Sequence, residues 1–237
     1  MIGFKKKRFW TDVSVVPSQA GFVIQLDGRS VKTPERAELA LPTQVAADLV
    51  AAEWDAQEGE LKPENMPATR WANVAIDKVS VSPTPVVDML AEYGSTDLLC
   101  YRATHPDELI ARQAAVWDQP LAWVKDRFDA PLACTQGVMA VSQPNQSLQN
   151  LRNAVAELDP FALAAFHDLV QISGSLVLAL MISEKATEAR SAWDAARVDE
   201  TWQIDQWGED EEAAEFAQTK RDAFFLAQEL LFSVKFG

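Results

Sequence analysis

The apolar pattern of this chain changes once, near Leu41–Pro42, and that change limits the fold more than any other feature of the sequence. Before it, short runs rich in β-branched and aromatic residues alternate with Gly, Pro and Asp, which is typical of short β-strands. After it, apolar residues recur at the three- and four-residue spacing of amphipathic helices. The sequence therefore predicts an α+β fold, with a small β-rich N-terminal domain followed by a larger all-helical C-terminal domain.

Three strands are predicted at the start of the chain. They span residues 8–16, 22–26 and 29–32. Asp27–Gly28 separates the last two strands. An Asp-Gly pair between such runs favours a type I′ hairpin turn, because both turn residues need a positive φ. We therefore expect at least two hairpins or a small meander.

Helices are predicted over most of the remaining chain. Thr43 is a candidate N-cap, and an apolar stripe formed by Ala46, Val50 and Trp54 runs along a helix that ends near Gly59. Further helices are predicted near 68–79, 85–99, 106–128, 146–158, 160–182, 187–204 and 209–234, with a strand or extended connector over 131–140. The proline pair at 83 and 85 predicts a boundary, so we expect domains over 1–84 and 85–237.

The charge of the chain argues against nucleic acid as a partner. Its 237 residues include 21 basic and 35 acidic ones, a formal net charge of −14. Nucleic-acid affinity depends largely on Lys and Arg side chains that neutralise phosphates. Residues 105–237 hold 21 acidic and only 10 basic residues. Electrostatic recognition is therefore expected in the C-terminal part, toward basic or mixed surfaces.

Residue sets that carry catalysis or bind metals do not occur in the sequence. Cys100 and Cys134 are too few and too far apart for a disulfide framework or a zinc site. His105 and His167 have no carboxylate or cysteine partner at ligand spacing. No phosphate-binding glycine loop, Walker-type lysine or G-x-S-x-G elbow is present. We expect no enzyme activity, no metal and no cofactor.

The N-terminal sequence and the hydropathy favour a cytoplasmic location. Residues 1–8 are basic, but the apolar segment of a secretory signal does not follow them. The longest uninterrupted apolar stretch, Leu176–Ile182, is far shorter than the roughly 20 residues that span a bilayer. We expect a monomeric protein without membrane insertion.

Two features indicate a contact surface. The chain has eight tryptophans, and tryptophan is favoured both in cores and at the centres of protein interfaces. The segment 199–215 holds eight acidic residues and no Lys or Arg. Such a run usually forms a solvated helix face, and acids near residue 210 would also suit the N-terminus of the last helix.

Glu200 differs from the other acids of this segment. It follows Trp193 and Ala196 at the spacing of one helical stripe, and Gln203 continues that stripe. Polar groups thus occupy positions that the pattern reserves for apolar ones, and an unpaired polar group is costly to bury. Both side chains either satisfy backbone groups at a buried helix junction or face a partner, and the sequence leaves these alternatives open.

Segments distributed in order over nearly the whole chain carry a family resemblance. They are Arg8-Phe9-Trp10, Leu26–Arg29 with Lys32-Thr33-Pro34, Leu41–Pro42, Glu53–Gln57, Met66–Thr69, Tyr93 with Thr96–Ala103, Trp117–Leu121, Gly174–Leu180, Asp199–Glu200 with Gln203, and Trp207–Ala213. In these segments the chain resembles the assembly chaperones of the ATP synthase alpha subunit.

The resemblance implies both a fold and a function. It implies a β-rich domain followed by a helical one, and a protein that keeps an unassembled alpha subunit of the F1 sector soluble until a beta subunit takes its place. It further implies no cofactor and no ATP hydrolysis by the chain itself. A bacterial cytoplasmic location is expected, with organellar relatives in the mitochondrial matrix. Together with the acidic segment, it predicts a client-binding set formed by Glu200, Gln203, Trp207, Asp210 and Glu211.

Two other functions are compatible with the same sequence. One is an enzyme of unrecognised type that uses carboxylates in a cleft between the two domains, where a raised carboxylate pKa would be expected. The other is a general acidic adaptor with several basic partners, whose binding would weaken at modest salt concentration.

Overall fold

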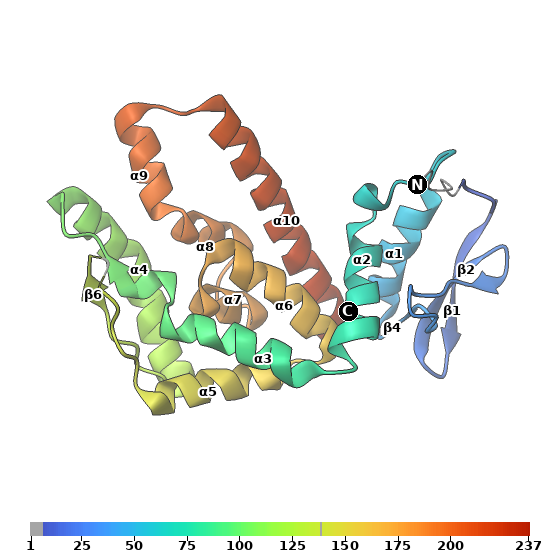
Figure 1. Ribbon diagram of the computed structural model, residues 1–237, viewed down its shortest axis with the longest axis horizontal. Helices are drawn as coiled ribbons and strands as arrows, with labels where there is room; N and C mark the ends of the chain where they lie inside the picture. The colour runs from blue at the N-terminus through green and yellow to red at the C-terminus, as the bar shows by residue number, and fades with distance from the viewer. Residues whose placement is uncertain (1–6, 138) are drawn as a thin grey trace, which may run out of the picture. The chain divides into compact units, whose positions relative to one another are not determined.

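The computed structural model describes residues 7–137 and 139–237, and the chain forms two compact units (Figure 1). The first unit comprises the residues up to Pro83 together with 160–164 and 230–237, and the second comprises 84–159 and 165–229. The four-stranded sheet belongs to the first unit, and helices dominate the second. The predicted α+β class is confirmed, and the division into domains at residue 84 stays a prediction.

The sheet of the first unit is built from short antiparallel strands. Strand β2 (Gly21–Leu26) pairs with β1 (Val13–Ser18), β3 (Arg29–Ser30) and β4 (Ala40–Leu41). The β2–β3 turn has φ angles of 48° at Asp27 and 76° at Gly28, which confirms the predicted hairpin.

The first strand starts later than the sequence predicts. The guanidinium of Arg8 donates hydrogen bonds to the carbonyls of Asp55 (2.5 Å) and Gln57 (2.8 Å). These contacts hold the segment before Val13 against the end of a helix, so it does not extend β1.

Helix α1 (Gln44–Asp55) packs on β1 and β2. The Thr43 hydroxyl accepts a hydrogen bond from the Ala46 N–H (3.1 Å), so the predicted N-cap is confirmed. Ala46, Ala47 and Val50 are fully buried, while Trp54 near the end of the stripe is only partly buried.

The second helical segment is fixed to the first by one carboxylate. After η1 (Pro63–Asn65), helix α2 (Pro67–Val74) continues into the π-helix η2 (Ala75–Val79). The Glu53 carboxylate accepts hydrogen bonds from the N–H groups of Ala68 (2.6 Å) and Thr69 (2.7 Å). Because these are free donors in the first turn of a helix, Glu53 caps α2 and holds α1 and α2 together.

Two remote chain segments complete the first unit. The Trp71 indole donates a hydrogen bond to the Phe161 carbonyl (3.0 Å), and the two rings pack edge to face at 5.7 Å. The Thr43 hydroxyl donates to the Ser233 carbonyl (2.6 Å). Residues far along the chain are therefore part of the core of this unit.

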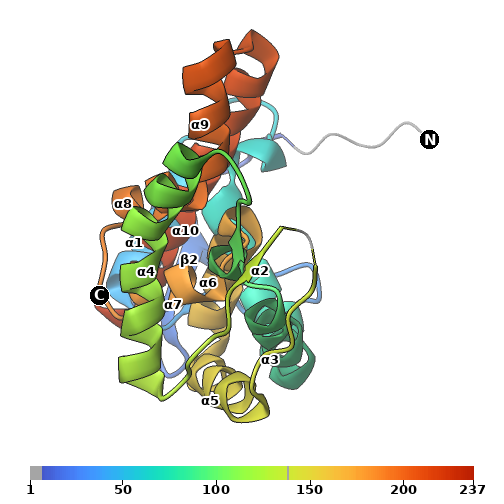
Figure 2. The ribbon, with the colours of Figure 1, turned by 90° about the vertical axis from the view of Figure 1, so that its left-hand side faces the viewer.

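The second unit is largely helical. Its elements are α3 (Pro83–Glu92), η3 (Tyr93–Ser95), η4 (Leu98–Cys100), β5 (Tyr101–Arg102), α4 (Asp107–Phe128), β6 (Thr135–Gln136), α5 (Asn145–Ala156), α6 (Pro160–Ser173), α7 (Leu176–Ser183), α8 (Ala189–Ala196), α9 (Val198–Trp207) and α10 (Glu211–Lys235). Three of these helices, α3, α6 and α10, have one end in the first unit. Because all of its residues are buried, α7 is the central helix of this unit. Helix α4 packs on it and also on α5 and α9 (Figure 2).

A buried carboxylate lies at the N-terminus of α7. Asp97 accepts hydrogen bonds from the Ser175 hydroxyl (2.8 Å) and from the N–H groups of Val177 (3.0 Å) and Leu99 (3.1 Å). Burial raises the pKa of Asp97 to about 6, although these hydrogen bonds oppose the shift.

The two cysteines of the chain meet at a short parallel ladder. Strand β5 pairs with β6, with Tyr101 opposite Thr135, so Cys100 and Cys134 precede the paired residues. Both are free thiols. Burial, followed by the nearby Asp97, raises the pKa of the Cys100 thiol.

Three of the predicted helices are divided in the structure. The segment predicted as 85–99 forms α3, which ends at Glu92, followed by the 3-10 turns η3 and η4. Gly174 has a φ of +68° and separates α6 from α7, within the segment predicted as 160–182. Arg197, with φ −116° and ψ 23°, separates α8 from α9, within the segment predicted as 187–204. Within residues 7–137 and 139–237, no helix combines the length and the apolar character needed to cross a membrane.

Candidate functional site

The break at Arg197 determines how the acidic segment is presented. Trp193 lies in α8 and is buried, whereas Glu200 lies in the first turn of α9 and is exposed. The apolar stripe drawn from Trp193 does not continue across the break, because α8 and α9 are separate helices. The alternative in which Glu200 is buried at a helix junction is therefore wrong.

The residues of the predicted client-binding set are all exposed and lie on two consecutive helices. Glu200 and Gln203 are on α9, and Trp207 is its last residue, with 78% of its surface exposed. Asp210 and Glu211 are at the start of α10. Asp210 accepts a hydrogen bond from the Ala213 N–H (2.9 Å), so it also caps that helix.

Two neighbouring acids bind other side chains, and Glu200 does not. Asp199 accepts a hydrogen bond from the Gln113 amide (2.7 Å), and Asp205 pairs with Arg112 at 2.6 Å. The Glu200 carboxylate makes no hydrogen bond or ion pair with any residue in the described ranges. Its carboxylate is thus available to a partner.

Glu200 lines a small hollow of about 260 Å³, together with Arg197, Lys220, Trp117 and Trp193. The walls are well fixed. The Trp117 indole donates a hydrogen bond to a backbone carbonyl of α8 (2.8 Å), and the Arg197 guanidinium lies 5.2 Å from the Trp193 ring centre. A hollow of this size suits a single side chain better than a cofactor, because cofactor and drug pockets are usually larger.

Exposed aromatic side chains accompany these acids. Trp207 on α9 is 78% exposed, and Phe216 on α10 is 62% exposed, with the Lys220 ammonium 4.7 Å from the Phe216 ring centre. Large exposed aromatic residues among charged ones are typical of protein-binding surfaces.

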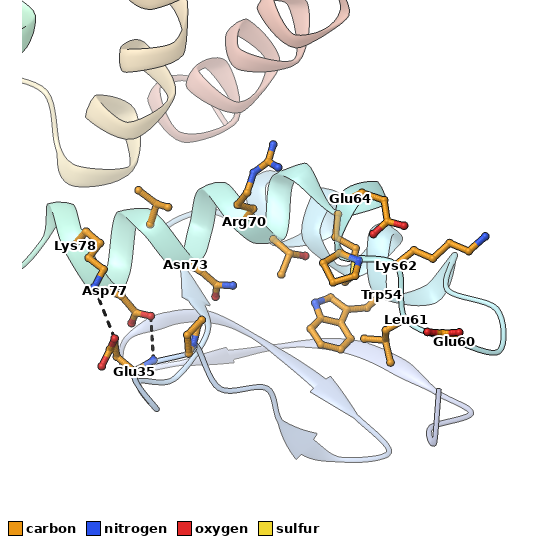
Figure 3. A pocket seen from close by; sticks show the side chains of 15 residues that line it. Glu35, Trp54, Glu60, Leu61, Lys62, Glu64, Arg70, Asn73, Asp77 and Lys78 are labelled. Atoms are coloured by element: carbon orange, nitrogen blue, oxygen red, sulfur yellow. Dashed lines mark hydrogen bonds and ion pairs between the residues drawn. The ribbon is translucent and has the colours of Figure 1, made fainter. Parts of the chain in front are cut away.

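The first unit contains a larger hollow, of about 1070 Å³, that the sequence reasoning did not predict (Figure 3). We call it the α2 groove. It is lined by residues of α1, of the 60–66 segment, of α2 and η2, and of the 34–35 loop: Pro34, Glu35, Trp54, Glu60, Leu61, Lys62, Pro63, Glu64, Met66, Thr69, Arg70, Asn73, Val74, Asp77 and Lys78. Figure 3 shows the Trp54 indole beneath α2, with Asn73 and Asp77 projecting from the helix. Their four-residue spacing places both on one face of the helix, but the spacing does not show that Trp54 lies beneath that face.

The loop at one end of the α2 groove is held by Asp77. Its carboxylate accepts hydrogen bonds from the Thr33 hydroxyl (2.6 Å) and the Glu35 N–H (3.1 Å), and Lys78 pairs with the Glu35 carboxylate at 3.7 Å. Asp77 and Lys78 belong to a π-helix, a geometry found frequently at functional sites.

Two polar atoms of the groove lining are buried without a hydrogen-bond partner among the described residues. They are the Trp54 indole nitrogen and the Asn73 side-chain oxygen. A buried polar group is normally paired, so an unpaired one calls for an explanation. No cluster of three His, Cys, Asp or Glu side chains that could hold a metal ion occurs in 7–137 or 139–237.

Comparison with known proteins identifies the family. The model of the ATP12 chaperone protein family matches residues 7–125, half of the chain. The chain belongs to the ATP12 chaperone family. The resemblance predicted from the sequence is therefore confirmed, and the chain is a chaperone of F1-ATPase assembly with an F1 subunit as its partner.

Known Atp12 proteins are similar to this chain over most of its length. The crystal structure of Atp12 from Paracoccus denitrificans is 40% identical, with a TM-score of 0.92 over 97% of this chain and 98% of that one. A mutant of that protein, with lysine in place of an aspartate, gives 39% and 0.93 over the same shares. The mitochondrial atp12 protein of Schizosaccharomyces pombe is 26% identical over 227 residues, which cover 88% of this chain and 76% of that protein.

Proposed function

We propose that this ATP12 family chaperone binds the unassembled alpha subunit of the F1-ATPase, prevents its aggregation, and releases it when a beta subunit takes its place. The observation that carries the proposal is Glu200, an exposed carboxylate that lines a hollow and has no partner among the described residues. The neighbouring Trp207 offers a large exposed apolar surface.

The physical task of such a chaperone explains why an unpartnered carboxylate and an exposed tryptophan lie on the same two helices. A subunit without its partner exposes apolar surface, and exposed apolar surface promotes aggregation. The chaperone must cover that surface and later leave it. Limited apolar contact through Trp207, with carboxylates facing basic groups of the client, gives specificity and fast encounter without irreversible affinity.

The proposed client-facing set has one member with the strongest support. Glu200 has no competing structural contact among the described residues, whereas Asp210 already caps α10. Gln203, Trp207 and Glu211 are exposed on the same two helices. We place Glu200 and Trp207 at the centre of the contact and the other three at its edge.

The proposal includes the mode of action. The chaperone acts as a monomer in the bacterial cytoplasm, without enzyme activity and without ATP hydrolysis of its own. Protection should therefore need no added nucleotide.

The test is suppression of aggregation of purified alpha subunit, without nucleotide, and with an unrelated aggregating protein as the control. The expected result is protection of the alpha subunit at a near-equimolar ratio and no protection of the control protein. Equal failure on both proteins would contradict the proposal, and equal protection of both would favour a general adaptor.

Replacement of Glu200 by lysine tests the site. Glu200→Lys reverses the charge of the unpartnered carboxylate, so it should weaken protection at least tenfold, which corresponds to about 1.4 kcal/mol or more. Because the side chain is exposed, the unfolding midpoint should stay unchanged.

The matched control is Glu157→Lys, the same charge change at an exposed residue after α5. It should leave protection unchanged. If both variants reduce protection equally, net charge decides the binding rather than the Glu200 site.

A further inference from the structure

We propose that the α2 groove holds an extended polypeptide segment of the client, with an apolar side chain against Trp54 and an acidic residue beside it. This inference rests on the proposed function, since it assigns a second contact to the same client. It concerns the first unit, whereas the Glu200 site lies in the second.

Segments that carry the family resemblance meet in this groove. Pro34, Trp54, Met66 and Thr69 all line it, and they come from three separate stretches of the chain. The match to the family model covers residues 7–125, which includes every lining residue and ends before α9. The part of the chain that matches the family model therefore contains the α2 groove and does not contain the acidic segment.

The size and apolar lining of the groove suit an extended chain. Its volume of about 1070 Å³ is at the upper end of the range of small-molecule pockets. A second hollow of about 580 Å³ shares Trp54 and Leu61 with it and is also lined by Phe9, whose side chain is 75% exposed. The apolar lining thus continues past the Trp54 indole, as a segment several residues long requires.

The unpaired polar atoms match a peptide group. The Trp54 indole nitrogen is a donor and the Asn73 oxygen is an acceptor, and both lack partners among the described residues. A peptide group supplies one acceptor and one donor. Neighbouring atoms cover both polar atoms, so the proposal requires these two side chains to rotate when the occupant binds.

The charges around the groove favour an acidic residue in the occupant. The groove lining has four acidic and three basic side chains, but Lys78 pairs with Glu35, Asp77 holds the 34–35 loop, and Glu60 has an interaction of its own. The charged side chains that remain are Lys62, Arg70 and Glu64, and none of these three forms an ion pair with a described residue. Phosphate-bearing ligands are disfavoured, because Glu53 already takes the N–H groups of the first turn of α2. The combination of apolar lining, a donor, an acceptor and two cations without an ion pair fits a polypeptide best.

Peptide binding to the full-length chain tests the inference. The probes are fluorescein-labelled, overlapping 15-residue peptides that span the alpha subunit, measured by fluorescence anisotropy. We expect binding by a few adjacent peptides that contain an apolar residue next to an acidic one.

Variants of the groove test where these peptides bind. Asn73→Ala removes the acceptor and should weaken peptide binding about tenfold. Arg70→Glu should weaken it at least as much, and Asn153→Ala, at an exposed asparagine of α5, should not change it.

An NMR signal locates the bound peptide. The indole N–H signal of Trp54, assigned by its loss in Trp54→Phe, should shift when a binding peptide is added. The indole signal of Trp123, on α4 in the second unit, should stay in place. Equal shifts of both signals would contradict binding in the groove.

The outcomes separate this inference from the proposed function. If the alpha subunit is protected but no peptide binds, or if peptides bind Asn73→Ala and Arg70→Glu as tightly as the unchanged protein, the groove inference is wrong and the proposed function stands. If peptides bind with the expected loss in the variants but protection of the alpha subunit fails, the groove inference stands and the proposed function is wrong.

Discussion

Asp97 is an ionisable group without access to water, and its titration should be visible in the stability of the protein. Its pKa is raised from 3.8 to about 6 in the folded state, mainly by burial. Between these two values the folded state binds more protons than the unfolded state, so the contribution of Asp97 to stability decreases as pH rises and is constant above the folded pKa.

Asp97→Asn should remove this pH dependence. The free energy of unfolding of the unchanged protein, relative to that of the variant, should fall by roughly 2 kcal/mol between pH 4.5 and pH 7. Urea unfolding of both proteins at several pH values measures this difference. A difference that stays constant over this range would mean that Asp97 does not titrate there.

Residues whose environment is local were predicted correctly from the sequence. Thr43 caps α1 and Asp27–Gly28 forms the hairpin turn, because both depend on neighbours a few residues away. The exposure of Glu200 could not be predicted, because it depends on whether the chain stays helical at Arg197. Asn73 gave no signal, since only the fold brings Trp54 beneath α2.

At the scale of elements, the link between α1 and α2 depends on Glu53. Its carboxylate accepts hydrogen bonds from two N–H groups of α2 and from the Thr69 hydroxyl (2.8 Å). Glu53→Ala should lower the free energy of unfolding by about 2–3 kcal/mol, because buried donors lose their acceptor. It should also weaken peptide binding to the α2 groove, since α2 forms one of its walls.

Urea unfolding measures the loss, with Glu58→Ala as the matched control. Glu58 is an exposed glutamate five residues further along the chain and makes no hydrogen bond or ion pair with a described residue. Its removal should change the stability by less than about 0.5 kcal/mol. Similar losses in the two variants would show that the cap contributes little.

The existence of the helices was easier to predict than their ends. Apolar periodicity extends over several turns, so α1, α4, α5 and α10 lie close to their predicted ranges. Breaks depend on one or two residues. Gly174 ends α6 because its φ is positive. Glycine permits a positive φ but does not require it, so the residue type alone does not predict the break. Arg197 has no such sequence signature, so the division between α8 and α9 was not predicted.

At the scale of the whole molecule, the first unit is discontinuous in sequence. It contains residues 160–164 and 230–237, which supply the Phe161 and Ser233 partners of Trp71 and Thr43. A fragment of residues 1–84, the predicted N-terminal domain, lacks both partners. We expect this fragment to be less stable than the same unit in the full chain by several kcal/mol, because two partly buried hydrogen bonds and an aromatic contact are lost.

Thermal unfolding followed by circular dichroism tests the fragment, with the full-length chain measured in parallel. We expect a broad transition without a folded baseline for the fragment. A cooperative transition near that of the full chain would contradict this expectation and would establish residues 1–84 as an independent domain.

The contribution of residues 230–237 to the first unit has a consequence for biosynthesis. A ribosome makes the chain from its N-terminus at about 5–20 residues per second, so residues 1–83 emerge on the order of ten seconds before the segment that completes their core. The α2 groove, which is built entirely from residues 34–78, therefore attains its full stability only after residues 230–237 have been made. A copy whose synthesis stops before residue 230 would then be a poor competitor for the client.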